Sequence, residues 1–428
     1  MKTPFIFIAL PLFFLSLDLS SQQTPSDILL LNENYDIIIK QLENKPILTE
    51  NELLNLALSY RQTGHPDKAI AVMESKAEHS SPRYTKLLSR LYFETGSYDK
   101  ALPLIKTIYE TDRSDYRNFI RYTDILNFRK KYRLTIDLLT TRLKTDSLNF
   151  EVNKRLGETY IRIDSLNLAA KQYEKLLSLY PENQVVAYKL AVLYLKIKEY
   201  RKSLNVCDTI LAYSADNTKF LALKGKVYFN VNQYKNAIIV MKKLENLGDH
   251  SYSTQRILGI SYFKKNNYTE AVSYLKNVLE IKPNDAIASY YLGASLANLP
   301  VPEEGIPYLK EAAEMLQPPA QVMEKIYYNL AMIYRKTEKF NLAVENLKKL
   351  MEYTPENIRY YLSVATIYEF NIKNNDEALK YYKKFISSLP PDPDPKKGNE
   401  RYNIRLKKYA ENRITKINEN NFFEAKKE

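Results

Sequence analysis

The chain has 428 residues and a formal net charge of +13, from 63 lysines and arginines against 50 aspartates and glutamates. Its single cysteine, Cys207, excludes an intrachain disulfide. The positive charge favours anionic partners, although solvated lysines on outer helix faces would account for much of it.

Residues 1–21 have the pattern of a secretory signal peptide. Lys2 supplies a positive charge, residues 5–17 form an apolar run, and the small residues Ser20 and Ser21 follow. The run is too short to predict a membrane span, so we expect export and cleavage of this segment. Retention as an uncleaved anchor is the alternative. No cysteine lies near the end of this segment, so a lipid-attachment signal is missing.

Residues 22–49 predict a pair of N-terminal helices that caps the fold. Ser26 and Asp27 are candidate helix caps, and Ile38 and Leu42 recur at helical spacing after them. This segment lacks the pattern that begins at residue 50, so we expect an irregular pair.

Residues 50–390 carry one pattern ten times. A small residue, here called the marker, is followed three positions later by tyrosine or leucine and, in most repeats, twelve positions later by a second small residue. All steps between successive markers from Ser89 to Gly293 have the same length, whereas the step from Gly293 to Ala331 is four positions longer and predicts a lengthened loop. In the tenth repeat the second small residue, Ala378, stands one place late. The markers are Ala57, Ser89, Thr123, Gly157, Ala191, Gly225, Gly259, Gly293, Ala331 and Ala365.

Residues 391–428 follow the last repeat. Proline, aspartate and glycine in residues 390–399 predict a loop. A helical pattern then runs from Arg401 to about Asn418, with Leu406 and Ile417 on one face and many basic residues on the other. We expect this helix to cover the last repeat.

The constant step between markers, with its small, aromatic and proline positions, resembles the tetratricopeptide repeat family, whose period is about 34 residues. The resemblance implies an all-α fold, a right-handed α-solenoid of about ten helix–turn–helix repeats between N- and C-terminal capping helices. In each repeat helix A carries the marker, helix B follows, and the tyrosine fills the space between successive pairs. One repeat cannot cover its own apolar faces, so residues 50–390 are expected to form one superhelix. Cys207 falls at a usually buried position of helix B.

The sequence does not predict catalysis. The histidines His65, His79 and His250 have no second histidine or cysteine at metal-ligand spacing. Neither a Gly-x-Ser-x-Gly nucleophile motif nor a phosphate-binding glycine loop is present in the sequence. We therefore expect a protein that is not an enzyme and that uses no metal or cofactor.

The resemblance implies a binding surface on the inner face of the superhelix, which helix A lines. The inner positions are those six, three and two residues before the marker and the one after it. In the second to fourth repeats Asp124 and Glu158 interrupt a set of cations, here called the basic patch: Lys86, Arg90, Arg117, Arg121, Lys154 and Arg155. Later repeats carry an aromatic patch: Ile260, Tyr290, Tyr291, Tyr328, Asn329 and Met332. Alternatively, these apolar side chains pack against the neighbouring helix and are never exposed.

These features predict an exported scaffold or adaptor that binds a protein or peptide partner, and no nucleic acid. The signal and the composition suggest a periplasmic or outer-membrane-associated location in a Gram-negative bacterium. The alternative function is direct binding of an anionic polysaccharide or lipid head group by the basic patch.

Overall fold

The computed structural model describes residues 25–75, 81–315, 320–390 and 398–425. The predicted signal peptide lies outside these residues. Within them the regular structure is helical and contains no strand, which confirms the all-α prediction. Contacts divide the chain into two compact units, Met1–Gln172 and Tyr173–Glu428, here called unit 1 and unit 2.

The helices of unit 1 in its described part are α1 (Pro25–Leu31), α2 (Tyr35–Leu42), α3 (Glu50–Gln62), α4 (Pro66–Glu74), α5 (Pro82–Glu94), α6 (Tyr98–Thr111), α7 (Tyr116–Phe128), α8 (Tyr132–Thr145) and α9 (Phe150–Arg162). Helix α10 (Leu166–Leu179) contains the boundary between the units. The helices of unit 2 are α11 (Gln184–Lys196), α12 (Tyr200–Tyr213), α13 (Thr218–Asn230), α14 (Tyr234–Asn246), α15 (Tyr252–Lys264), α16 (Tyr268–Ile281), α17 (Ala286–Leu296), η1 (Pro302–Glu304), α18 (Gly305–Met315), α19 (Ala320–Lys336), α20 (Phe340–Tyr353), α21 (Arg359–Ile367), η2 (Tyr368–Ile372), α22 (Asn375–Ser387) and α23 (Gly398–Ala425).

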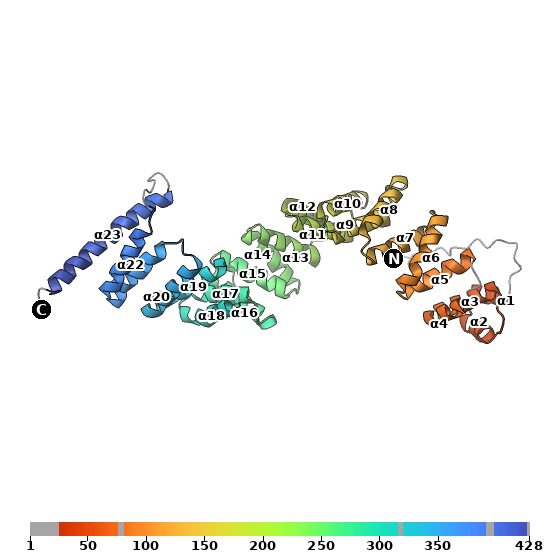
Figure 1. Cartoon of the computed structure of the whole chain (residues 1–428), viewed down its shortest axis with the longest axis horizontal. Helices are drawn as coiled ribbons and strands as arrows, with labels where there is room; N and C mark the ends of the chain where they lie inside the picture. Colours follow the sequence, from red (N-terminus) through yellow and green to blue (C-terminus); the bar gives the residue numbers. More distant parts are fainter. Residues whose placement is uncertain (1–24, 76–80, 316–319, 391–397, 426–428) are drawn as a thin grey trace, which may run out of the picture. The chain divides into compact units, whose positions relative to one another are not determined.

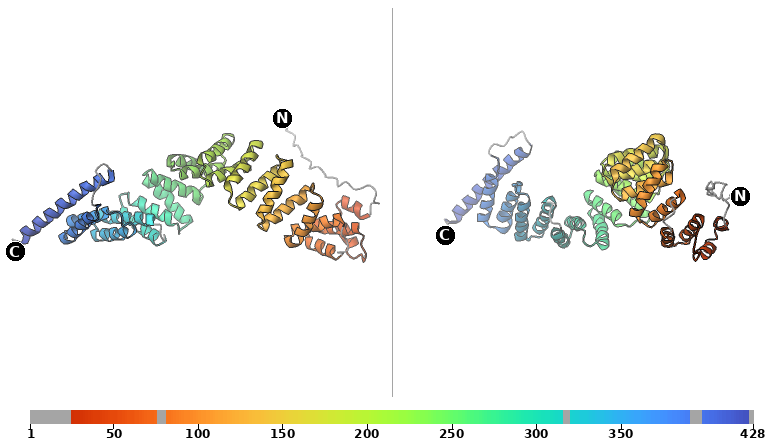
Figure 2. Two further views of the ribbon diagram at one scale, coloured as in Figure 1. Left: turned by 45° about the horizontal axis from the view of Figure 1, so that its top comes forward. Right: turned by 45° about the vertical axis from the view of Figure 1, so that its right-hand side comes forward.

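Each predicted repeat forms a helix A and a helix B. The two helices pack against each other from α3 with α4 to α7 with α8 in unit 1, and from α11 with α12 to α21 with α22 in unit 2. Helices that follow one another along the chain lie side by side within each unit (Figure 1), and the further views agree (Figure 2). Helices α1 and α2 pack on α3, and α23 packs on α22. This packing confirms the predicted α-solenoid with terminal helices.

Helix A begins at an equivalent capping residue in eight successive repeats. The side chain eight residues before each marker accepts a hydrogen bond from a backbone N–H of the first helical turn, which satisfies a donor that the helix itself leaves unpaired. These N-caps are Thr49, Ser81, Asp115, Asn149, Asn183, Asn217, Ser251 and Asp285.

The turn between helix A and helix B needs one residue in the left-handed region. Seven residues after the marker, eight repeats have a residue with positive φ: Gly64, Gly96, Lys130, Asp164, Lys198, Asn232, Asn266 and Glu338. In the eighth repeat this position is Pro300, whose ring fixes φ at a negative value. The turn there runs through the short helix η1 instead. The four extra residues between Gly293 and Ala331 do not lie in this turn. They lengthen helix A of the ninth repeat, α19, which has 17 residues where α15 has 13, so the prediction of a longer loop is wrong.

The tenth repeat accommodates an extra residue differently. Its helix A ends in the π-helical turn η2, and the left-handed residue, Lys373, stands eight residues after the marker Ala365. A π-helical turn contains one residue more than an α-helical turn. This insertion explains why Ala378 stands one place late.

The markers lie where helix A and helix B approach most closely. A Cβ atom on Gly259 would lie 2.8 Å from Leu275 Cγ, and one on Gly293 would lie 2.8 Å from the backbone oxygen of Gly305. Tyr92, three residues after its marker, is buried and donates a hydrogen bond of 2.5 Å to Glu74 on the preceding helix B. The prediction that this tyrosine fills the space between successive pairs is therefore confirmed in that repeat. Cys207 is buried, as predicted.

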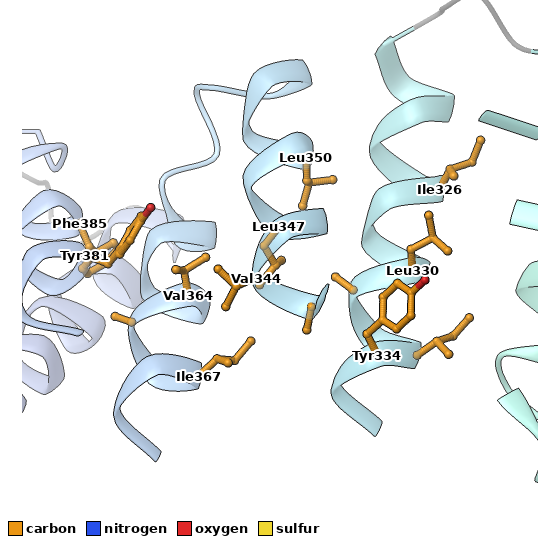
Figure 3. Close-up of a cluster of buried hydrophobic side chains, with 14 of the residues drawn as sticks. Ile326, Leu330, Tyr334, Val344, Leu347, Leu350, Val364, Ile367, Tyr381 and Phe385 are labelled. Atoms are coloured by element: carbon orange, nitrogen blue, oxygen red, sulfur yellow. The ribbon is translucent and has the colours of Figure 1, made fainter. Parts of the chain in front are cut away.

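The last repeats of unit 2 form the largest continuous apolar cluster. Side chains from α19, α20, α21 and α22 fill the spaces between successive helices (Figure 3). Helix α23 extends this cluster through Ala410 and Ile417. Arg413 on α23 donates to buried Glu369 in η2 at 2.9 Å, and Tyr382 donates to the same carboxylate at 2.6 Å. The predicted C-terminal helix is thus present, longer than expected, and fixed to the last repeat.

Candidate functional site

The basic patch lies on three consecutive A helices of unit 1, namely α5, α7 and α9. Its side chains are exposed or partly buried. The structure also places carboxylates near them, and these decide which cations are available to a ligand.

The two cations of α5 are both paired. Lys86 Nζ lies 3.0 Å from Asp115, the N-cap of α7. Arg90 Nε donates to Glu94 at 2.8 Å, and Arg61 on α3 grips the same carboxylate with two hydrogen bonds of 2.6 and 2.9 Å. Burial would raise the pKa of Glu94, but the hydrogen bonds from Arg61 and Arg90 outweigh it and hold that pKa below its ordinary value.

The two cations of α9 are paired as well. Arg155 contacts Asp124 on α7, and its Nε lies 2.9 Å from Glu151. Lys154 Nζ lies 3.0 Å from the same Glu151. Burial raises the pKa of Asp124, although the positive charge of Arg155 opposes that shift. These pairs link successive A helices and leave little free charge on α9.

The two arginines of α7 differ from the other four cations. Within the described residues, no carboxylate forms an ion pair with Arg117 or with Arg121. Arg121 is half-buried and donates one hydrogen bond of 3.2 Å, from Nη1 to Asn118 Oδ1. Burial and then the positive charge of Arg90 lower the pKa of Arg121, although Glu94 and Asp115 oppose the shift. The unneutralised charge of the basic patch is therefore concentrated on α7.

The aromatic patch lies on α15, α17 and α19 of unit 2, and its members differ in exposure. Ile260 and Tyr290 are only 3% and 8% exposed, so they pack inside the protein, in agreement with the alternative stated from sequence. Tyr291 and Asn329 are partly buried. In contrast, Tyr328 is 45% exposed and Met332 is 42% exposed. Only these last two residues of the patch present large exposed apolar surface.

Partly buried Tyr291 belongs to an aromatic cluster formed by α15 and α17. Its ring centroid lies 5.0 Å from that of Phe263 and 5.0 Å from that of Tyr290. The ammonium of Lys264 lies 5.5 Å from the Tyr291 ring centroid. The buried environment of Tyr290 raises its pKa to about 12, although a hydrogen bond with Asn329 opposes the shift. This contact joins α17 to α19 at the patch.

The residues that sequence reasoning missed are Arg61, Glu94, Asp115 and Glu151, which hold the basic patch together. Asp115 could have been found, because it stands at the N-cap position, eight residues before a marker. Glu94 and Glu151 stand four residues from Arg90 and Arg155, a spacing that brings side chains together on a helix.

No group of histidine, cysteine or carboxylate side chains in the described part of the chain could hold a metal ion. The helices among the described residues are each too short or too polar to span a bilayer.

Sequence models of the tetratricopeptide repeat match four stretches of the chain, residues 54–116, 164–227, 258–318 and 324–357. The matched stretches lie within the ten repeats described above. The chain is a tetratricopeptide repeat protein. Members of this family act in general as scaffolds for protein interactions and are in general not catalytic.

Several solved tetratricopeptide repeat structures are similar to this chain. YrrB, described as having an unusual peptide-binding site, is 23% identical, with a TM-score of 0.41, over 45% of this chain and 98% of that chain. A protein from Parabacteroides merdae is 17% identical, with a TM-score of 0.42, over 59% of this chain and 98% of that chain. A chain of the APC/C hetero-tetramer Cut9–Hcn1 is 13% identical, with a TM-score of 0.40, over 91% of this chain and 96% of that chain. No curated protein matches the sequence.

Proposed function

We propose that this tetratricopeptide repeat protein is a non-catalytic scaffold of a bacterial cell envelope that binds partner polypeptide segments on the A helices of unit 2. The observation that carries the proposal is the exposure of Tyr328 and Met332. The two residues stand four positions apart on α19, so their side chains lie one above the other on the same helix face.

Tyrosine and methionine are enriched in protein interfaces, because they bury large areas against a partner. Neighbouring repeats show that this exposure is not required by the fold. Tyr290 stands at the same repeat position as Tyr328 and is buried, as are Ile260 and Ala294 at the position of Met332. An apolar side chain of a helix or an extended segment would be covered at Tyr328 and Met332.

Site-specific photo-crosslinking in the native cell tests the polypeptide partner. A photoreactive phenylalanine analogue at position 328 should give a discrete adduct that mass spectrometry identifies as one protein. The matched control is the same analogue at Ile239, which is 60% exposed on the B helix α14 of the same unit. Adducts of equal yield at both positions, or none at position 328, would contradict the proposal.

The envelope location is a separate part of the proposal. It is supported by the signal-peptide pattern of residues 1–21. Protease treatment of spheroplasts tests it, with a tag placed at the C-terminus. Degradation in spheroplasts but not in intact cells is expected, and protection in both preparations would place the protein elsewhere.

One observation favours a second function, direct binding of an anionic ligand to the basic patch. Arg117 and Arg121 form no ion pair with any carboxylate of the described residues. The other four cations are paired, so the charge available to a ligand is smaller than the sequence suggested. This function would be exerted through α7 rather than through the whole patch.

A further inference from the structure

The unpaired charge of Arg121 has a cause in the repeat itself. Arg155 stands two residues before its marker and contacts Asp124, which stands one residue after the preceding marker. Arg121 stands at the same position as Arg155, one repeat earlier. The residue at the position of Asp124 is there Arg90. The geometry that gives Arg155 a carboxylate therefore gives Arg121 a second cation.

The half-buried guanidinium of Arg121 is also held in place. Asn118 accepts its hydrogen bond at 3.2 Å and in turn donates to Asp115 at 2.8 Å. Asp115 is fixed as the N-cap of α7. Most of the five N–H groups of Arg121 remain available, and Arg117 stands one helical turn away, exposed and on the same face. Two guanidinium groups are thus presented together from one helix.

We propose that Arg117 and Arg121 bind two carboxylates of an extended acidic polypeptide segment. This proposal rests on the proposed function of the protein as a polypeptide-binding scaffold. Side chains one helical turn apart are separated by about 5–6 Å. Carboxylates of alternate residues in an extended chain point to one side and are about 7 Å apart. A segment with the pattern acidic-x-acidic matches this spacing, and each arginine can form a pair of charge-assisted hydrogen bonds.

The surroundings favour a peptide over a densely charged polymer or a lipid surface. The negative charges of Glu94 and Asp115 lie close enough to Arg121 to act on its pKa, and Asp124 lies on the same helix. A continuous polyanion or an anionic membrane would bring further negative charge onto these carboxylates. A segment with only two or three acidic residues places its charge at the arginines alone. The occupant that this surface fits is therefore a short acidic stretch of protein.

Binding is tested with a fluorescent peptide of alternating glutamate and serine, and with the same peptide carrying glutamine for glutamate. The wild-type protein should bind the first and not the second. Replacing both arginines, Arg117→Gln with Arg121→Gln, should weaken binding by at least about tenfold. The matched control, Arg133→Gln with Lys144→Gln on α8, removes the same charge from exposed residues of unit 1 and should leave the affinity unchanged.

A third variant tests whether Arg121 is available because Arg90 stands where Arg155 has a carboxylate. Arg90→Asp should supply Arg121 with the carboxylate that Arg155 has, and so weaken peptide binding while thermal stability is kept. Circular dichroism melting curves identify a variant that fails to fold, and the exposed Arg117→Glu then replaces it as the test. Equal binding of both peptides, equal affinity of wild type and the double variant, or binding of heparin or of phosphatidylglycerol vesicles without the peptide would overturn the inference. A crosslinked partner at position 328 that persists in these variants would leave the scaffold function standing.

Discussion

Lys198 offers a sharp test of the repeated turn geometry. It is the left-handed residue between α11 and α12, with φ of 63°. A residue with a Cβ atom pays roughly 1–2 kcal/mol in this conformation, and glycine does not. Glycine loses about 0.5–1 kcal/mol more backbone entropy on folding, so Lys198→Gly should stabilise unit 2 by about 0.5–1 kcal/mol.

The control is Lys226→Gly in the middle of α13, which also removes one exposed lysine from unit 2. Glycine inside a helix should cost about 1 kcal/mol, so the two variants should change stability in opposite directions. Urea unfolding followed by far-UV circular dichroism measures both against the wild type. If Lys198→Gly destabilises the protein as much as Lys226→Gly does, the explanation of the turn is wrong, and with it the account of Pro300.

Three further predictions follow from the packing of unit 2. Gly293→Ala would place a Cβ atom 2.7 Å from Leu309 Cγ, so calorimetry should show a loss of about 1–3 kcal/mol. Burial would raise the pKa of Asp285, but hydrogen bonds from Tyr252 and the Ala288 N–H and the charge of Arg256 outweigh it, so the pKa is lowered. The ionised Asp285 carboxylate should therefore stabilise the protein above the ordinary aspartate pKa, and this stabilisation should be lost as the pH falls below it. In Asp285→Asn the midpoint of urea unfolding should change less with pH over that range than it does in the wild type. Burial raises the pKa of the Cys207 thiol to about 12, so native protein should resist iodoacetamide until urea unfolds it.

The repeat pattern predicted the fold because helix packing uses the same residue types at the same positions. Small markers such as Gly259 are needed wherever helix A meets helix B, and they leave a visible period. The two irregular repeats were visible only as changes in spacing. Their explanation needs the backbone conformation, since one step is lengthened by an extra turn of helix α19 and the other repeat contains the π-helical turn η2.

The candidate site was less predictable, because exposure depends on partners in the neighbouring repeat. The sequence places six cations at equivalent positions but does not show that Asp115 reaches Lys86 or that Asp124 reaches Arg155. The burial of Ile260 and Tyr290 likewise depends on the neighbouring helix. The resemblance implied which positions to inspect, whereas the availability of each side chain to a ligand had to come from the structure.

A single pair of repeat positions accounts for much of the difference between side chains that are paired or buried and side chains that are available to a ligand. The residue two before a marker faces the residue one after the preceding marker, as Arg155 faces Asp124. In unit 2 the same pair is Tyr291 with Ile260, and Ile260 is buried. After Met332 the corresponding residue is Ser363, whose short polar side chain covers little, and Met332 is exposed. In two pairs of this kind, Arg121 with Arg90 and Ser363 with Met332, the neighbouring repeat does not supply a matching side chain. At these positions a bound partner would supply the missing carboxylate or apolar contact.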